Sequence, residues 1–234
     1  MRPQLLIPQT VLIPGGSFGM GNDAGRADER LAHHVTVEAF RAGLRPVSNA
    51  EFAAFVTATG HEVPLFLQDE RFAAPEQPVV GTSWHDAVAY CAWLSAETDM
   101  LYRLPTEAER EYAALGGLER ADWPWGDAAP DSIPFCRELS ALDRPHIPTT
   151  GCANGYGLLC MADNVHEWCS DWYGATYYTE SPSEAPRGPE SGKRRASRGG
   201  SWRHQIVFNR VSARSSLDPS FHYNDYGFRV YAEA

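Results

Sequence analysis

The chain has 234 residues, a length that is ample for a buried core. Of these residues 43% are hydrophobic and 12% aromatic, a composition that excludes a disordered protein or a coiled coil. Its 17 Pro and 20 Gly exclude long helices and predict extensive ordered coil. A formal net charge of −10 at pH 7 opposes attraction to nucleic acid or anionic membranes, so we expect neither as a partner.

Residues 1–8 carry one Arg and a short apolar stretch that Pro8 breaks, which is too short for the hydrophobic region of a signal peptide. No uninterrupted apolar run in the sequence approaches the roughly 20 residues that cross a bilayer. The five Cys form no CxxC pair, and their odd number favours reduced thiols over disulfides or structural zinc. We therefore expect a cytoplasmic protein.

Residues 13–21 contain four Gly and predict a tightly turning backbone. A phosphate-binding loop is disfavoured here, because the segment lacks the required Lys and no helical pattern follows it. Further along, Val35, Val37 and Ala39 alternate with polar residues, which predicts a half-buried strand.

Three helices are predicted from their start signals, each a Ser or Thr followed three residues later by an acidic residue. These capping pairs are Ser48 with Glu51, Ser83 with Asp86, and Thr106 with Glu109. The first helix is expected to end near Gly60 and the third at Gly116. The apolar spacing of the second helix places Cys91 in the core.

Beyond residue 117, aromatic residues occur in islands separated by turn residues, which predicts short strands and loops. The fold class is therefore α+β, and we expect one domain over residues 1–234. Residues 180–197 are rich in Pro, Ser, Glu and Gly and predict a surface loop. Its basic end, Lys193 to Arg195, is interpreted as a solvated turn, with a docking patch as the alternative.

The densest polar group among the aromatic residues lies between Asn154 and Trp172. Amide and carboxylate oxygens such as those of Asn164 and Glu167 are suited to calcium, which prefers oxygen ligands. The alternative is that these side chains satisfy backbone groups in a core rich in loops. His166 beside Glu167 is weak support for a transition metal.

A second group, between Arg198 and Ser215, combines Gly residues with guanidinium, hydroxyl and imidazole groups. Such a segment is suited to holding an anionic or amide-rich ligand, and a purely structural turn is the alternative. A Ser–His nucleophile is poorly supported, because sequence shows neither hydrogen-bond reach nor a third orienting group.

The order of motifs along nearly the whole chain resembles the formylglycine-generating enzyme, or sulfatase-modifying factor, superfamily. The matching motifs include Ile13–Phe18, Pro46–Phe52, Arg103–Glu109, Asn154–Leu158, Asn164–Trp168, Arg198–Trp202 and Gly227–Arg229. The resemblance implies a C-type-lectin-like α+β fold with little regular secondary structure. Members include copper-dependent oxidases that convert a sulfatase Cys to formylglycine, iron-dependent sulfoxide synthases, pyoverdine-maturation proteins and non-catalytic ligand-binding proteins.

In the formylglycine-generating members, two Cys after the Gly-Gly-Ser-aromatic motif bind copper as thiolates. Here residues 203–209 contain no Cys: His204 stands at the first position, and the second falls near Phe208 or Asn209. The sequence therefore argues against formylglycine generation by the family mechanism. The chain also lacks the His-x-x-x-His signature of the sulfoxide synthases, so catalytic copper or iron of either family type is not expected.

The resemblance further implies one structural calcium site, with the Asn164 and Glu167 side chains and the Val165 carbonyl as ligands. A second family site begins near residue 135, where this chain has Phe135-Cys136, and is not expected here.

Three functions remain open. The first is an oxidative or biosynthetic enzyme, similar to the pyoverdine-maturation branch, that acts on a peptide or a small metabolite. Its expected catalytic residues are Ser201, His204, Arg210 and Arg214, with His204 as a general base or sole imidazole metal ligand. Its expected ligand-binding residues are Trp202, Arg203, Asn209 and Tyr226.

The second function is a non-catalytic binding or scaffold module that uses Trp202 and Tyr226 as contact surface. A third hypothesis gives the chain a protein partner, as a subunit that associates with a helical iron-binding protein.

Overall fold

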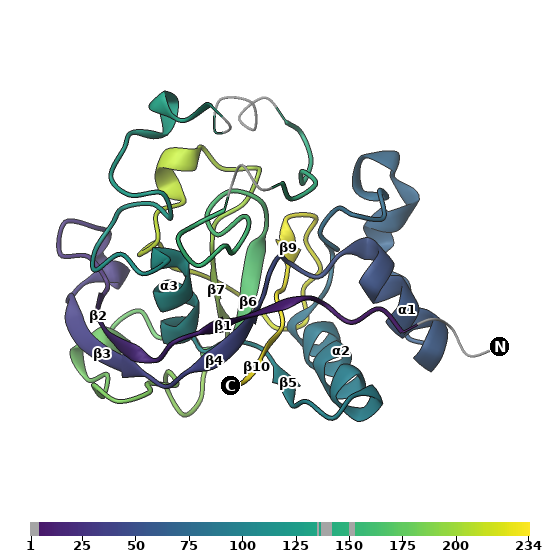
Figure 1. Ribbon diagram of the computed structural model, residues 1–234, viewed down its shortest axis with the longest axis horizontal. Helices are drawn as coiled ribbons and strands as arrows, with labels where there is room; N and C mark the ends of the chain where they lie inside the picture. The colour runs from purple at the N-terminus through teal and green to yellow at the C-terminus, as the bar shows by residue number, and fades with distance from the viewer. Residues whose placement is uncertain (1–4, 135, 137–141, 150–152) are drawn as a thin grey trace.

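A computed structural model describes residues 5–134, 136, 142–149 and 153–234. Figure 1 shows α1 and α2 together on one side of the molecule and α3 on the other, with strands between them. The helices of the described residues are α1 (Asn49–Thr59), α2 (Trp84–Glu97) and α3 (Glu107–Leu115). Short 3-10 helices are η1 (Ala27–Glu29), η2 (Leu65–Gln68), η3 (Glu70–Phe72), η4 (Pro130–Ser132), η6 (Tyr177–Thr179) and η7 (Ile206–Phe208).

The predicted capping boxes are confirmed at all three helix starts. Ser48, Ser83 and Thr106 each accept a hydrogen bond from the backbone N–H of the acidic residue three positions later, whose side chain reaches back to the cap. Left-handed glycines, Gly60 and Gly116, end the first and third helices as expected.

The strands form three sheets. The first sheet has the order β1-β4-β10-β5, the second is the hairpin β2-β3, and the third has the order β8-β7-β6-β9. Their bounds are β1 Thr10–Ile13, β2 Gly16–Met20, β3 His33–Val37, β4 Phe40–Gly43, β5 Tyr102–Arg103, β6 His166–Trp172, β7 Arg195–Arg198, β8 Ser215–Leu217, β9 Tyr226–Gly227 and β10 Tyr231–Glu233. The glycine-rich segment 13–21 thus contains the end of β1 and the whole of β2. The strand predicted over Val35, Val37 and Ala39 is β3, but β3 ends at Val37, so Ala39 lies outside it.

The surface loop predicted over residues 180–197 is shorter in the structure, where it ends before Arg195. Arg195 to Ser197 belong to β7, which pairs with β6 and β8, and Ser197 is buried. The Arg195 guanidinium lies 3.9 Å from the ring centroid of Trp84 and 3.5 Å from that of Trp172. These cation–π contacts hold Arg195 against the protein, so it belongs to the packed structure rather than to a solvated basic turn.

Two large hydrophobic clusters of described residues fill the interior. One joins α3 to the first two sheets through side chains that include Phe18, Phe40, Leu115 and Tyr231. The other joins α1 and α2 to the third sheet, and Cys91 lies in it as predicted. The Asn154 side chain donates to the Ala113 carbonyl at 2.7 Å and so fastens the end of α3 to the following coil.

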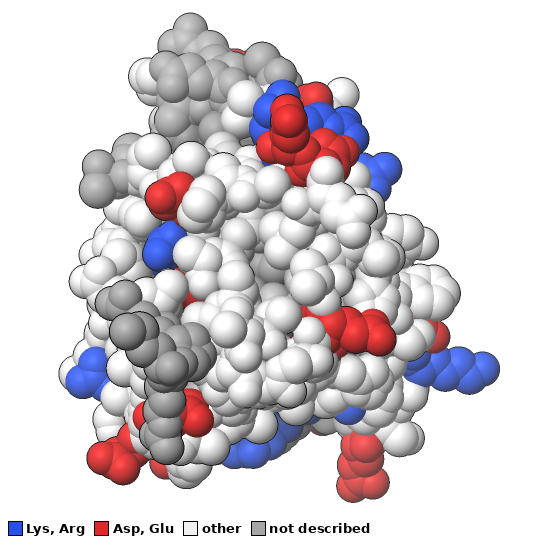
Figure 2. All heavy atoms as spheres, turned by 90° about the vertical axis from the view of Figure 1, so that its right-hand side faces the viewer, with Lys and Arg blue, Asp and Glu red and all other residues white. Residues whose placement is uncertain are grey.

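In the described part of the chain, no helix combines the length and the apolar character that crossing a membrane requires. Figure 2 shows the face on the right of Figure 1, where the described Lys and Arg side chains stand singly or beside acidic ones.

Candidate functional site

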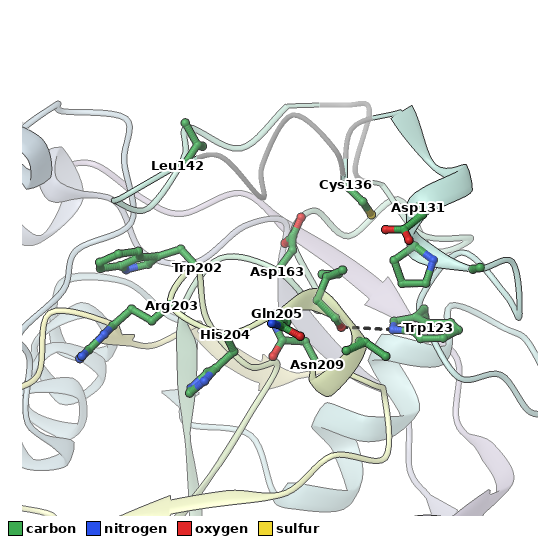
Figure 3. Close-up of a pocket in the computed structure, with 14 residues that line it drawn as sticks. Trp123, Asp131, Cys136, Leu142, Asp163, Trp202, Arg203, His204, Gln205 and Asn209 are labelled. Atoms are coloured by element: carbon green, nitrogen blue, oxygen red, sulfur yellow. Dashed lines mark hydrogen bonds between the residues drawn. The ribbon is translucent and has the colours of Figure 1, made fainter.

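A cavity of about 810 Å³ opens between the loop that follows β7 and the coil around η4. Figure 3 shows the rings of Trp202 and Trp123 at opposite ends of this cavity, with Asp163 between them. The lining also includes Asp131, Cys136, Leu142, Arg203, His204, Gln205, Ile206 and Asn209. Of the predicted site residues, Trp202, Arg203, His204 and Asn209 are therefore brought together on one cavity.

The third sheet positions the residues beneath this loop. β6 and β9 run parallel with His166 opposite Tyr226, and the His166 N–H donates to the Asp225 carbonyl at 2.8 Å. The Trp202 N–H donates to the Asn164 carbonyl at 2.9 Å, which docks the loop on the start of β6. Residues 60 positions apart are thus held as neighbours by backbone hydrogen bonds.

The side chains of His166 and His204 meet at this junction, with their Nε2 atoms 3.1 Å apart. His166 is buried, and its ring stacks on Tyr226 with a centroid distance of 4.7 Å. Burial, with a smaller contribution from the neighbouring His204 and Arg203, lowers the pKa of His166 to about 3, so the ring is neutral at physiological pH. His204 is exposed and so is accessible to a ligand in the cavity.

The predicted residue Ser201 is fully buried and does not line the cavity. Its hydroxyl donates to Asp225 Oδ2 at 3.0 Å, which orients that carboxylate. The Asn209 amide donates to the Ser201 carbonyl at 3.2 Å and closes the loop. Arg203 lies with Nη1 3.8 Å from Asp225 Oδ1, while its side chain is 51% exposed. The predicted contact residue Tyr226 stacks on the His166 ring and does not line the cavity.

Arg210 and Arg214 do not line the cavity, and the structure gives both a structural role. Arg210 binds both oxygens of Glu29 at 2.7 Å. The buried Arg214 binds both oxygens of Glu107 at 2.8 Å. Burial alone would raise the pKa of Glu107, but the guanidiniums of Arg214 and Arg198 outweigh it and lower that pKa to about 2. The expected role of the two arginines in holding substrate therefore finds no support in their positions.

The side chains expected to bind calcium are arranged for other partners. Both oxygens of the buried Glu167 accept from guanidiniums, at 2.7 Å from Arg110 Nε and 2.9 Å from Arg229 Nη2. The Asn164 amide is hydrogen-bonded to the His146 backbone. Because two cations already neutralise the carboxylate, these residues do not fit a calcium ion as they stand.

A thiolate copper pair has no counterpart among the described lining residues. Cys136 is the one Cys among them, and Cys91, Cys160 and Cys169 are buried outside the lining. Cys152 and Phe135 lie outside the described residues, so the predictions that involve them have no structural account. Asp163, also in the lining, is buried, and among the described residues neither of its carboxylate oxygens has a hydrogen-bond partner, although His146 Nε2 lies 3.5 Å from Oδ2.

Sequence reasoning gave His166 little weight and did not single out Asp225. The motif Asn164–Trp168 includes His166, but nothing local places that residue against a His 38 positions later. Only the parallel pairing of β6 with β9, together with the docking of the loop, brings the three side chains into one place.

Comparison with known proteins gives a consistent set of relatives. A family model described as a sulfatase-modifying factor enzyme 1-like domain matches residues 1–234. The chain is 35% identical to the formylglycine-generating enzyme of Streptomyces coelicolor, over 96% of this chain and 89% of that enzyme. It is 33% identical to the serine/threonine-protein kinase pkn1 of Chlamydia caviae, over 98% of this chain and only 38% of that protein. Among solved structures, PvdO from Pseudomonas aeruginosa superposes with a TM-score of 0.80 at 26% identity, covering 97% and 95% of the two chains.

Proposed function

Because the chain belongs to the sulfatase-modifying factor family and has its C-type-lectin-like α+β fold, we propose that it is an oxidative or biosynthetic enzyme acting on a peptide or a small metabolite. The observation that carries the proposal is the cavity of about 810 Å³ with the exposed His204 on its wall and the neutral His166 behind it. That volume suits a ligand the size of a small metabolite or of a few peptide residues.

The charges around the cavity support a ligand that carries both an anionic or amide group and a donor group. Arg203 is half exposed and offers guanidinium donors to a carboxylate or amide oxygen. Asp163 offers a buried carboxylate whose oxygens have no hydrogen-bond partner in the described part of the chain, so a donor on the ligand would offset its desolvation. The ring of Trp202 adds apolar surface to the same cavity.

His204 is the group placed to handle a proton. Its Nε2 lies 3.1 Å from that of His166, and since His166 stays neutral it can accept a hydrogen bond from His204 or donate one to it. The pair can therefore orient the exposed imidazole and fix its tautomer, as a general base requires.

We propose further that the reaction differs from formylglycine generation. The imidazole of His204 stands where the family's first copper-binding Cys is expected, and Cys136 is the one Cys in the described lining. Imidazole and carboxylate are harder ligands than the thiolate pair suited to monovalent copper.

The experiment is an aerobic incubation of the purified protein with a metabolite pool and with a sulfatase-type peptide containing Cys, analysed by mass spectrometry. We expect a change in one metabolite or peptide other than conversion of that Cys to an aldehyde. The change should disappear in His204→Ala, whose thermal midpoint should stay that of the parent because the side chain is exposed. Aldehyde formation on the Cys peptide would reject the distinction from the family enzymes.

A second candidate is a non-catalytic ligand-binding module. It is favoured by the ion pairs of Arg210 with Glu29 and of Arg214 with Glu107, because two side chains expected to be catalytic are bound to other protein groups instead. Under this function the protein would bind a compound and release it unchanged, so no turnover would be seen. His204→Ala would then weaken binding of that compound. Turnover by the parent protein therefore separates the two candidates.

A further inference from the structure

Three groups with metal-binding atoms converge beside the cavity from separate parts of the chain. His166 comes from β6, His204 from the loop after β7, and Asp225 from the residue before β9. One ligand atom of each, an imidazole nitrogen or a carboxylate oxygen, lies within 4.8 Å of the others.

The spacing of the two imidazoles suits one ion. Metal–nitrogen bonds of about 2.0–2.1 Å place two nitrogens about 2.9 Å apart at a right angle and about 3.4 Å apart at a tetrahedral angle. The observed Nε2–Nε2 separation of 3.1 Å lies between these values. Two imidazoles and one carboxylate form a donor set that iron(II) and zinc(II) share, and it leaves further coordination positions open.

The surroundings hold these ligands in place. Ser201 donates to Asp225 Oδ2, and the His166 N–H bonds the Asp225 carbonyl, so side chain and backbone both fix the carboxylate. The ring of Tyr226 stacks on that of His166. Such outer contacts orient metal ligands in known sites. His204 is exposed on the cavity wall, which gives an ion a path from solvent.

Arg203 is the cationic side chain next to Asp225, and its charge opposes a metal ion. Its Nη1 lies 3.8 Å from Asp225 Oδ1, but its side chain is 51% exposed and can turn into solvent without leaving a buried group unpaired. The other carboxylate oxygen is held by a neutral hydroxyl.

We propose that His166, His204 and Asp225 form a binding site for one divalent transition-metal ion, iron(II) or zinc(II), with an open position toward the cavity. The site replaces soft sulfur donors with nitrogen and oxygen. His204 then acts as one of three ligands instead of the sole imidazole. Metal binding itself does not require catalysis, but a role for the metal in the reaction rests on the proposed enzyme function.

The test measures metal binding without turnover. Purified protein freed of metal is titrated with Zn²⁺ by calorimetry, and with Fe²⁺ under anaerobic conditions, and bound metal is counted by elemental analysis. We expect one ion per chain for at least one of the two metals. His204→Ala should abolish this binding, Asp225→Asn should weaken it strongly, and Ser201→Ala should weaken it on the order of 10–100-fold.

The control variant is His222→Ala, which removes another exposed imidazole, one that contacts Asp86. It should bind the ion as the parent does. A competing trio, His146, Cys160 and Asp163, also has ligand atoms within 4.8 Å of one another, and His146→Ala reports on it.

Full binding by His204→Ala, binding lost only in His146→Ala, or no binding by the parent would each overturn the proposed site. Absence of binding combined with turnover that depends on His204 would leave the enzyme proposal standing with His204 as a base. Binding without turnover would reject the enzyme proposal and keep the metal site.

Discussion

Arg110 donates from Nε to Glu167 Oε2 at 2.7 Å, and the two side chains are 1% and 0% exposed. Arg110 also donates to the Met161 carbonyl at 3.0 Å, and Arg229 binds the other Glu167 oxygen. Burial alone would raise the pKa of Glu167, but the two guanidiniums outweigh it and lower that pKa. The protein therefore supplies its own cations to the carboxylate at the expected calcium position.

Calcium removal should leave the stability of this protein unchanged. A ligand that binds only the folded state raises the unfolding midpoint by mass action, and its removal lowers it. Since the Glu167 oxygens are already bound by Arg110 and Arg229, we expect the same thermal midpoint in excess calcium and in excess chelator. A midpoint that falls on chelation and returns with calcium would show that the family site is kept.

Arg110→Met should destabilise the fold by about 3–5 kcal/mol, the usual cost of removing one partner from a buried ion pair. The loss leaves Glu167 with one guanidinium and the buried Met161 carbonyl without the Arg110 donor. Urea denaturation at neutral pH measures the free energy of unfolding. The matched control is Arg103→Ala, from a pair with Glu109 in which the Arg side chain is 38% exposed, where about 1 kcal/mol or less is expected. Equal losses in the two variants would contradict the argument.

The helices could be predicted because their signals are local. Ser48 and Glu51 lie within one helical turn, so the capping box can be read directly from four consecutive residues. Gly116 ends α3 for an equally local reason, its left-handed backbone. The family motifs extended this to the whole fold.

The candidate site depended on long-range pairing. His166 and Asp225 become neighbours only through the register of β6 with β9, which no short segment specifies. Arg214 lies in a stretch whose composition suited a ligand site, but its partner, Glu107, is 107 residues away. A sequence pattern shows that a charged residue is present, while its partner is decided by the fold.

Asp171 should make stability fall as the pH rises through the acid range. The residue is buried and accepts from the Glu107 N–H at 2.9 Å. Burial, followed by the Glu107 charge, raises the pKa of Asp171 to about 7 from its ordinary 3.8. Between these two pKa values the folded protein holds a proton that the unfolded chain has released. The stabilisation from protonated Asp171 is therefore complete below pH 3.8, falls as the pH rises, and is lost by about pH 7.

Asp171→Asn keeps an oxygen acceptor and removes this titration. The difference in unfolding free energy, parent minus variant, should decrease by about 1.4 kcal/mol per pH unit between roughly pH 5 and 7 and level off above that range. Comparing this difference cancels groups that titrate alike in both proteins, and Glu107 stays ionised throughout this range because its pKa is about 2. Urea denaturation across the range measures it, and a flat difference would show that Asp171 is ionised throughout.

Gly200→Ala should damage both the fold and the loop that carries His204. Gly200 has a φ of +62°, and a Cβ there would lie 2.0 Å from Asn209 Oδ1. Because Asn209 is buried and donates to the Ser201 carbonyl, it can give way only by breaking the bond that closes the loop. We expect a loss of about 1–3 kcal/mol from backbone strain, with the cost of displacing Asn209 in addition.

Gly60→Ala is the matched control, since Gly60 has a φ of +74° and, its chain neighbours aside, no described residue comes within 4 Å of the added Cβ. It carries the backbone strain alone, about 1–2 kcal/mol. Urea denaturation compares the stabilities, and Zn²⁺ titration compares the loops: Gly200→Ala should lose more stability and bind the ion more weakly, while Gly60→Ala should bind it as the parent does. Similar stability losses with unchanged Zn²⁺ binding in both variants would mean that Asn209 adapts without moving the loop.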